Sequence, residues 1–313
     1  MAQLGMSKLE MRQHIEKLNR LNLDRVGYEI IKSNIEKMFD GIRIIAGTTS
    51  SHELFFRARK KTNEKISLIS ELIAPPPDKV TGFQRCNSPG QPVFYCSSRR
   101  VSALLECNAK TGDIFYLSQW IGNTQLPVNK IFDEKENIEL LNHISDKEIL
   151  FHSYMNTMFT RRVHSSFSND YKITSAISEQ LMNKFKKDEK KKIEEDGKIG
   201  LRYPSVADIE NSYNTAFPPD FAVNRIDLLH VMEIEITDHH ENQLQASLLN
   251  TAIDFDDEKI IWSNNTGSLP APRPKEGGVL FEVVNGKWRV LTTERFSLPN
   301  EAINPLLNEL LNE

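Results

Sequence analysis

The stretch RCNSPGQPVFYCSSRRVSALLE, residues 85–106, decides how we interpret this chain of 313 residues. It places Arg85 and Asn87 before a Pro-Gly turn, then a short apolar strand that contains Tyr95, and then a helix that carries Glu106. A strand in a protein core needs only apolar side chains, so the surrounding charged and polar residues exceed what packing requires. The stretch therefore predicts a turn–strand–helix unit that forms one wall of a functional site.

The strand and the helix of this stretch each present a candidate functional group. Successive side chains of a strand point to opposite faces, so one of Phe94 and Tyr95 lies in the core and the other can offer its ring to a ligand. Ser97 or Ser98 is the expected cap of the helix. Glu106 falls in the second helical turn among apolar neighbours, where it either lies at the helix edge or takes part in chemistry. Composition alone favours the edge.

The composition describes a globular protein with a sizeable core. Hydrophobic residues make up 39% of the chain and charged residues 26%, and the net charge is −4. Dedicated nucleic-acid-binding domains are usually basic, so this balance disfavours nucleic acid as a partner. No apolar run reaches membrane-spanning length, and the polar N-terminal sequence does not resemble a signal peptide. We therefore expect a cytoplasmic protein without membrane association.

The cysteines and histidines give no sign of a metal centre. Cys86, Cys96 and Cys107 have spacings that fit no zinc pattern, and their odd number does not indicate a disulfide framework. No histidine lies near them to serve as a base, so we expect three small buried thiols. The histidines show no ligand spacing, and His239-His240 is expected in an exposed turn. No metal is expected.

Hydrophobic periodicity divides the chain into a helical lead-in and a larger mixed domain. Residues 7–40 have helical spacing with a break near Asn22, and Gly41 is a stop signal. We predict an N-terminal helical extension over 1–45 and one domain over 46–313. That domain is expected to contain a helical insertion at about 126–167 and a charged segment at 184–196, whose mixed signs are typical of a solvated surface.

The remaining patterns indicate the fold class. Strand-like runs begin near 54, 92, 113, 200 and 228, a hairpin is expected over 280–291, and the sequence PLLNELL near the C-terminus predicts a short helix. Strands and helices alternate without a regular βαβ period, and no glycine-rich nucleotide-binding motif is present. We therefore predict an α+β fold with a mixed, mostly antiparallel sheet and flanking helices.

Three further segments contain residues that plain packing does not require. Arg57 ends an apolar strand and has the planar fork that suits phosphate, although a surface ion pair is the simpler interpretation. Ser205 follows Pro204 in GLRYPS, where it either fixes a ligand or shapes a turn. Asn214 either binds a ligand or shapes a loop.

The order of these residues resembles the pattern of RES-domain proteins, a family of toxins from bacterial toxin–antitoxin pairs. That family shows an Arg after the first strand, an Arg-x-Asn-x-x-Gly turn, a Tyr at a strand end and a Glu eleven residues later. Here the matching residues are Arg57, Arg85 with Asn87 and Gly90, Tyr95 and Glu106. GLRYPS matches the family's Gly-x-x-Tyr-Pro-Ser segment with Ser205, and Asn214 falls where the family often has an asparagine. The resemblance covers roughly 53–125 and 168–236.

The resemblance implies an ADP-ribosyltransferase-like fold that consumes NAD as substrate and needs no metal. Glu106 would stabilise the ribose cation and Tyr95 would stack on nicotinamide or ribose. Ser205 would hydrogen-bond the nicotinamide amide or the ribose. Arg57, with Arg85, would clamp the pyrophosphate, and Asn87 and Asn214 would complete the dinucleotide site. A neutralising antitoxin is the implied protein partner.

Several alternatives stay open from sequence. With water as acceptor the reaction is NAD hydrolysis, with phosphate it is phosphorolysis, and with a protein side chain it is ADP-ribosylation. A nucleotide-binding module without catalysis is one rival, and a toxin that acts on RNA through Arg57, Arg59, Arg99 and Arg100 is another. The N-terminal helices are also candidates for regulation or for assembly into a homo-oligomer.

Overall fold

The computed structural model describes most of the chain. The described residues are 5–131, 143–183, 199–207, 212–240 and 243–263, except 63 and 165, together with the backbone of short strands at 267–268, 281–284 and 287–290. The charged segment at 184–196 and the predicted C-terminal helix lie outside the described residues. So do parts of the predicted insertion at 126–167.

One large sheet organises the fold, and within the described residues it has ten strands. In spatial order the strands are β1 (Ala46–Thr48), β5 (Pro127–Lys130), β6 (Gly200–Pro204), β7 (Tyr213–Phe217), β3 (Phe94–Ser97), β2 (Leu54–Lys60), β4 (Ile114–Gly122), β8 (Ile226–His240), β9 (Gln243–Ala252) and β12 (Gly267–Ser268). β5 and β6 pair in parallel, and the other neighbours pair antiparallel. The predicted α+β class with a mixed, mostly antiparallel sheet is confirmed.

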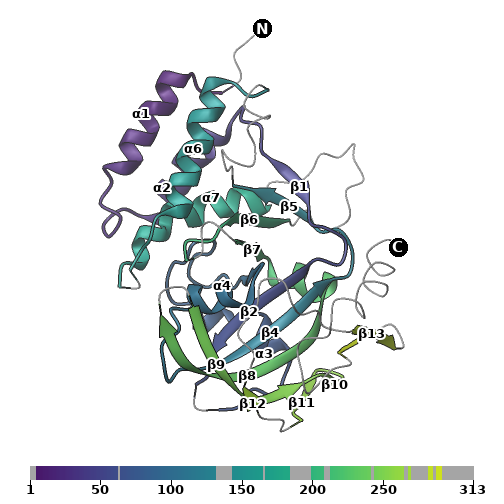
Figure 1. Cartoon of the computed structure of the whole chain (residues 1–313). Helices are drawn as coiled ribbons and strands as arrows, with labels where there is room; N and C mark the ends of the chain where they lie inside the picture. Colours follow the sequence, from purple (N-terminus) through teal and green to yellow (C-terminus); the bar gives the residue numbers. More distant parts are fainter. Residues whose placement is uncertain are drawn as a thin grey trace.

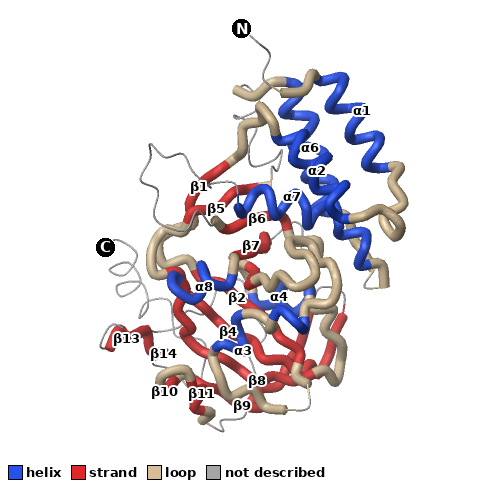
Figure 2. Tube along the Cα trace, turned by 180° about the vertical axis from the view of Figure 1, so that it is seen from behind, coloured by secondary structure: helices blue, strands red, loops and turns tan. Residues whose placement is uncertain are grey.

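Four longer helices gather at the β1–β5–β6 end of the sheet (Figures 1 and 2). They are α1 (Lys8–Asn19), α2 (Tyr28–Phe39), α6 (Asp146–Thr160) and α7 (Lys172–Asn183). Their apolar faces share one core, in which Met11, Ile35, Phe151 and Ile177 are buried. The N-terminal helices, predicted from spacing, are confirmed. They pack against helices from much later in the chain rather than standing apart.

The ends of these helices follow ordinary capping rules. Ser7 and Glu10 form a capping box at the start of α1, and Ser145 and Glu148 form another at the start of α6. Gly41, the predicted stop signal after α2, has a φ of 67°, a backbone conformation that favours glycine. The boundary at residue 45 and the status of 126–167 as an insertion stay predictions. The first residues of that segment form β5, so it contributes a strand as well as helices.

An ion pair ties the linker after α2 to α6. The Arg43 guanidinium donates to both carboxylate oxygens of Glu148, at 2.8 and 2.7 Å, and the Arg43 backbone N–H donates to the same side chain at 3.0 Å. Arg43 holds the pKa of Glu148 well below its usual range. His152, buried one turn further on, bonds the Arg43 carbonyl oxygen at 3.0 Å. The linker is thereby fixed where the chain enters the sheet.

A second apolar core lies under the middle of the sheet. In this core the Phe55 ring meets the Phe217 ring edge to face, and the Phe94 ring meets Trp120 in the same way. Two short helices, α3 (Ser70–Ile73) and α8 (Pro219–Arg225), cover the core. Phe94 is fully buried here, whereas Tyr95 faces the other side. The predicted alternation of these two residues is confirmed. A small ribbon of β10 (Asp254–Asp256) and β11 (Lys259–Ile261) and the predicted hairpin of β13 (Phe281–Val284) and β14 (Lys287–Val290) complete the described strands.

Some local predictions were wrong. The helix after β3, α4 (Arg100–Glu106), has Arg99 at its N-cap position, without a side-chain cap. Ser98 instead accepts a hydrogen bond from the Tyr213 backbone N–H at 3.2 Å, because β7 pairs with β3. Cys107 is exposed rather than buried. His239 and His240 end strand β8 instead of forming a turn.

Candidate active site

Helix α4 carries Glu106, and a buried polar anchor fixes the helix on the sheet. Arg100, the first residue of α4, lies over the ring of Phe56 at 5.2 Å and donates to Gln119 Oε1 at 2.6 Å. Burial lowers the pKa of Arg100 to about 10, so it stays charged at neutral pH. His230 also bonds this oxygen, at 2.9 Å. The anchor sets where the other end of the helix, and therefore Glu106, is placed.

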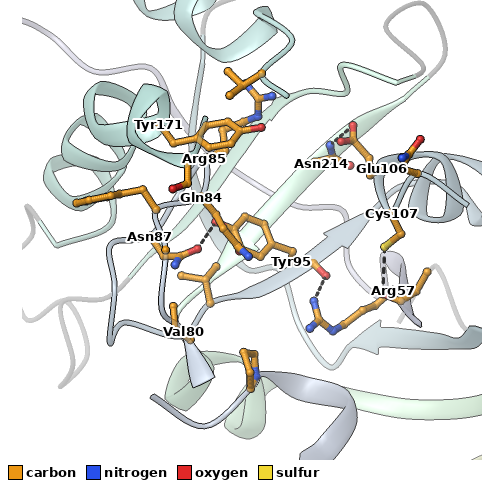
Figure 3. Close-up of a pocket in the computed structure, with 18 of the residues that line it drawn as sticks. Arg57, Val80, Gln84, Arg85, Asn87, Tyr95, Glu106, Cys107, Tyr171 and Asn214 are labelled. Atoms are coloured by element: carbon orange, nitrogen blue, oxygen red, sulfur yellow. Dashed lines mark hydrogen bonds between the residues drawn. The ribbon is translucent and has the colours of Figure 1, made fainter. Parts of the chain in front are cut away.

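One carboxylate oxygen of Glu106 receives a converging set of donors. Glu106 Oε1 accepts from Ser205 Oγ at 2.6 Å, Asn214 Nδ2 at 2.8 Å, and the backbone N–H groups of Val206 at 3.0 Å and Ala207 at 3.4 Å. Figure 3 shows Asn214 directed at this carboxylate. Oε2 accepts no hydrogen bond from the residues that the structure describes. The carboxylate is therefore held by one oxygen, with the other available to a ligand.

Tyr95 uses its hydroxyl to hold the turn that precedes its own strand. The hydroxyl accepts from the Cys86 backbone N–H at 2.8 Å and donates to Asn87 Oδ1 at 2.7 Å. Burial raises the pKa of Tyr95 well above its ordinary value, so the phenol keeps its proton and remains a donor. The hydroxyl is thus fixed at the turn, and the Tyr95 side chain lines the cavity described below (Figure 3).

Arg57 lies below Tyr95 and bonds backbone carbonyls. Its Nε donates to the Leu72 carbonyl oxygen at 2.8 Å and its Nη1 to the Tyr95 carbonyl oxygen at 2.9 Å, and the guanidinium lies 5.6 Å from the centre of the Phe94 ring. Burial lowers the pKa of Arg57 from its ordinary value. Because the ordinary pKa of arginine is very high, the guanidinium still carries its positive charge. Arg57 therefore joins β2, β3 and α3 while placing a positive charge under the site.

Arg85 points away from Glu106, toward the end of α6. Its guanidinium donates to the carbonyl oxygens of Phe159 and of Arg161, the latter at 3.3 Å, and lies 5.3 Å from the centre of the Tyr171 ring. These carbonyls are among those left without intrahelical partners where a helix ends. Arg85 thus joins the turn at 85–90 to the segment that leaves α6.

These groups border one cavity of about 1100 Å³. Glu106, Asn214 and Cys107 lie at one side of it, Arg85 and Tyr171 at the other, and Tyr95 lies between them (Figure 3). The predicted site residues that line the cavity are Arg57, Arg85, Asn87, Tyr95, Glu106 and Asn214. Ser205, fully buried, does not line it but holds Glu106 from behind. The volume is sufficient for a ligand of dinucleotide size.

Sequence reasoning missed other residues of the cavity wall. Phe83, Lys79, Arg162, His164 and Tyr171 line it as well. Phe83 and Lys79 belong to the loop before the motif, and the other three belong to the segment between α6 and α7. Arg162 and His164 lie in irregular backbone, which has no periodicity that would have revealed them.

Ser205→Ala tests whether the donor set orients Glu106. The change removes the shortest of the hydrogen bonds to Oε1 and leaves the fold of β6 intact, because the backbone N–H of Ser205 still bonds the Ser212 carbonyl oxygen. We expect about 10-fold lower turnover of the substrate at saturation. Steady-state kinetics measure this, with Ser205→Thr, which keeps the hydroxyl, as the variant that recovers activity. Equal turnover of Ser205→Ala and the wild type would contradict the role.

A comparison with family models identifies the domain, since the model described as RES domain matches residues 55–237. The chain belongs to the RES-domain family. A comparison with curated proteins found no match. The RES match runs from β2 into β8 and includes every predicted site residue, whereas α1 and α2 precede it.

Two further observations concern metal ions and the membrane. In the described part of the chain, no group of His, Cys, Asp and Glu is arranged to hold a metal ion. Among the same residues, no helix has both the length and the apolar character needed to cross a bilayer. The cytoplasmic location stays a prediction.

Proposed function

We propose that this RES-domain protein consumes NAD by cleaving the bond between nicotinamide and ribose. That bond breaks through a transition state like an oxocarbenium ion, in which positive charge develops on the ribose. An oriented carboxylate beside the ribose stabilises this charge without reorganising during the reaction. Glu106 is the residue that we assign to this role.

The observation that carries the proposal is the one-sided fixing of Glu106. Donors from β7 and from the loop between β6 and β7 all bond Oε1, so the carboxylate is held in one orientation when charge develops nearby. Oε2 is then the oxygen that we expect next to the ribose. Ser205 and Asn214 act in this proposal as positioning residues rather than as ligands of nicotinamide.

Tyr95 and the arginines fit a role in binding the dinucleotide. The Tyr95 ring lines the cavity, and its hydroxyl is occupied by Cys86 and Asn87, so the ring face is what it offers to nicotinamide or ribose. The charges of Arg57 and Arg85 favour a substrate with an anionic pyrophosphate. Arg57 and Arg85 also donate to backbone carbonyl oxygens, so we propose that they hold neighbouring segments in place as well as attracting the ligand.

The acceptor of the ribosyl group is either water or phosphate in this proposal, which corresponds to an NAD glycohydrolase or an NAD phosphorylase. A protein ADP-ribosyltransferase is the alternative, and a nucleotide-binding module without catalysis is another. Each of the catalytic forms suits a toxin or defence effector, for which the family implies a neutralising antitoxin as partner.

The arrangement of the arginines does not favour action on RNA. Arg59 donates to the Glu71 carbonyl oxygen, and Arg100 bonds Gln119 inside the protein. Arg57 is likewise bonded to carbonyls. These three side chains point inward, and of the four arginines in the RNA alternative only Arg99 is exposed. An RNA-binding surface needs several exposed cations along one face.

Nicotinamide release by the purified protein tests the proposal. We expect release from NAD that rises with protein concentration, and the product distinguishes the acceptors, since ADP-ribose forms with water and ADP-ribose 1″-phosphate with phosphate. The assay is run with and without phosphate, and with a denatured sample as control. Binding of NAD without any release, under both conditions and with cell extract added as a source of protein acceptors, would overturn the catalytic proposal in favour of a binding module.

A further inference from the structure

The cations of the cavity differ in how many of their donors remain for a ligand. NAD carries a pyrophosphate with two negative charges, which needs donors in addition to a positive field. Arg57 and Arg85 each donate twice to backbone carbonyls, and Arg85 is almost fully buried. Lys79 lies at the rim beside Asp78. Arg162 lines the cavity, is exposed, and makes no ion pair with the described residues.

Arg162 and His164 belong to one short segment that borders the cavity. α6 ends at Thr160, and Arg161 has extended backbone (φ −67°, ψ 130°). Arg162, Val163 and His164 all line the cavity, so this segment forms a continuous part of its wall, and Arg162 and His164 are its two polar side chains. His164 Nδ1 accepts from the Ser166 backbone N–H at 3.3 Å, so in the neutral ring the proton is on Nε2, which can donate to an anion.

The segment is held at both of its ends. Arg85 bonds the carbonyl oxygens of Phe159 and Arg161 at the start. The side chain of Arg161 pairs with Asp170 across the segment, and Tyr171 then packs against Arg85. Arg85 therefore links the turn at 85–90 to the segment that carries Arg162. Its contacts are those of a residue that positions this segment.

We propose that Arg162 and His164 form the pyrophosphate subsite of the cavity, and that Arg85 acts mainly by positioning their segment. The inference rests on the proposed function for the identity of the ligand as a dinucleotide. It places the phosphates near Arg162, on the side of the cavity away from Glu106. The subsite thus comes from the segment between α6 and α7 rather than from the RES motif residues Arg57 and Arg85.

ADP binding tests the subsite without requiring turnover. Calorimetry with ADP compares the wild type, Arg162→Ala, His164→Ala and the control Arg12→Ala, an exposed arginine on α1. We expect ADP to bind about 10- to 100-fold more weakly to Arg162→Ala and about 2- to 10-fold more weakly to His164→Ala, with no change for the control. For NAD turnover, Arg162→Ala raises KM and leaves kcat unchanged. Unchanged ADP affinity in Arg162→Ala, or no ADP binding by the wild type, overturns the subsite.

A double-variant cycle tests the positioning role of Arg85. If Arg85 acts through Arg162, Arg85→Lys weakens ADP binding in the wild type but adds little in the Arg162→Ala background. Losses that simply add would show that Arg85 contacts the ligand by itself and would overturn the positioning role. Circular dichroism and thermal unfolding establish that each variant is folded.

The two proposals fail in different ways. Absence of nicotinamide release, with ADP binding that depends on Arg162, overturns the proposed reaction and supports the phosphate subsite. Normal release, with ADP affinity and KM unaffected by Arg162→Ala, overturns the subsite and leaves the reaction in place.

Discussion

Glu106→Gln is expected to lower kcat for nicotinamide release by roughly 10²–10³-fold, the range seen when one electrostatic contact to a transition state is removed. Glutamine has the same shape, and its amide oxygen can still accept from Ser205 and Asn214. The negative charge next to the ribose is lost, while the donor set and the cavity wall remain. The free energy of unfolding should therefore change little, and KM for NAD should stay within a few-fold.

The matched control is Glu29→Gln, which removes the same charge from the exposed surface of α2. The measurement is the initial rate of nicotinamide release at saturating NAD, with thermal unfolding recorded for each variant. Glu106→Gln with the turnover of the wild type would exclude Glu106 as the group that stabilises the ribose cation. Loss of activity in the control as well would point to an effect of net charge.

Tyr95→Phe is expected to destabilise the protein by about 2–4 kcal/mol, because two groups lose their partner at once. The Cys86 N–H and the amide oxygen of Asn87 both bond the Tyr95 hydroxyl, and Asn87 is buried. The turn that they belong to carries Arg85, so we also expect a higher KM for NAD. Denaturant unfolding gives the change in free energy, and steady-state kinetics give KM.

Tyr154→Phe is a control of the same chemistry. The hydroxyl of Tyr154 is buried in α6 and has no hydrogen-bond partner among the described residues. Removing it relieves an unsatisfied polar group, so this variant should be as stable as the wild type or slightly more stable. Equal destabilisation by both changes would mean that the ring environment, rather than the hydrogen bonds of Tyr95, determines the result.

Much of the fold was predictable because local pattern and tertiary structure agree. The periodicity of 7–40 predicted two helices, and the alternation of Phe94 and Tyr95 predicted which faces they occupy. The predicted cap of α4 was wrong, because a residue from a distant strand bonds the expected capping side chain. Ser97 or Ser98 was expected to cap α4, but neither does. The Ser98 hydroxyl accepts from the Tyr213 N–H of β7, and the local sequence does not indicate that pairing.

The same limit applies to the candidate site. Composition favoured Glu106 at the helix edge, and the residue is indeed exposed, yet its donors come from β7 and from the loop between β6 and β7. Arg57 and Arg85 were expected to clamp phosphate, whereas each also bonds carbonyl oxygens. Every residue carries such a carbonyl, so this kind of partner leaves no mark in the sequence.

The residues that hold Glu106 lie far behind it in the sequence, and this distance affects when the site can be completed during synthesis. Asn214 follows Glu106 by 108 residues, and Ser205 follows it by 99. At translation rates of about 5–20 residues per second, the ribosome needs roughly 5 to 20 seconds to pass from one to the other. During this interval the nascent chain displays the turn, Tyr95 and Glu106 without the groups that fix the carboxylate. Under the proposed function, a chain that has not yet reached Asn214 therefore lacks the oriented carboxylate on which cleavage of NAD depends.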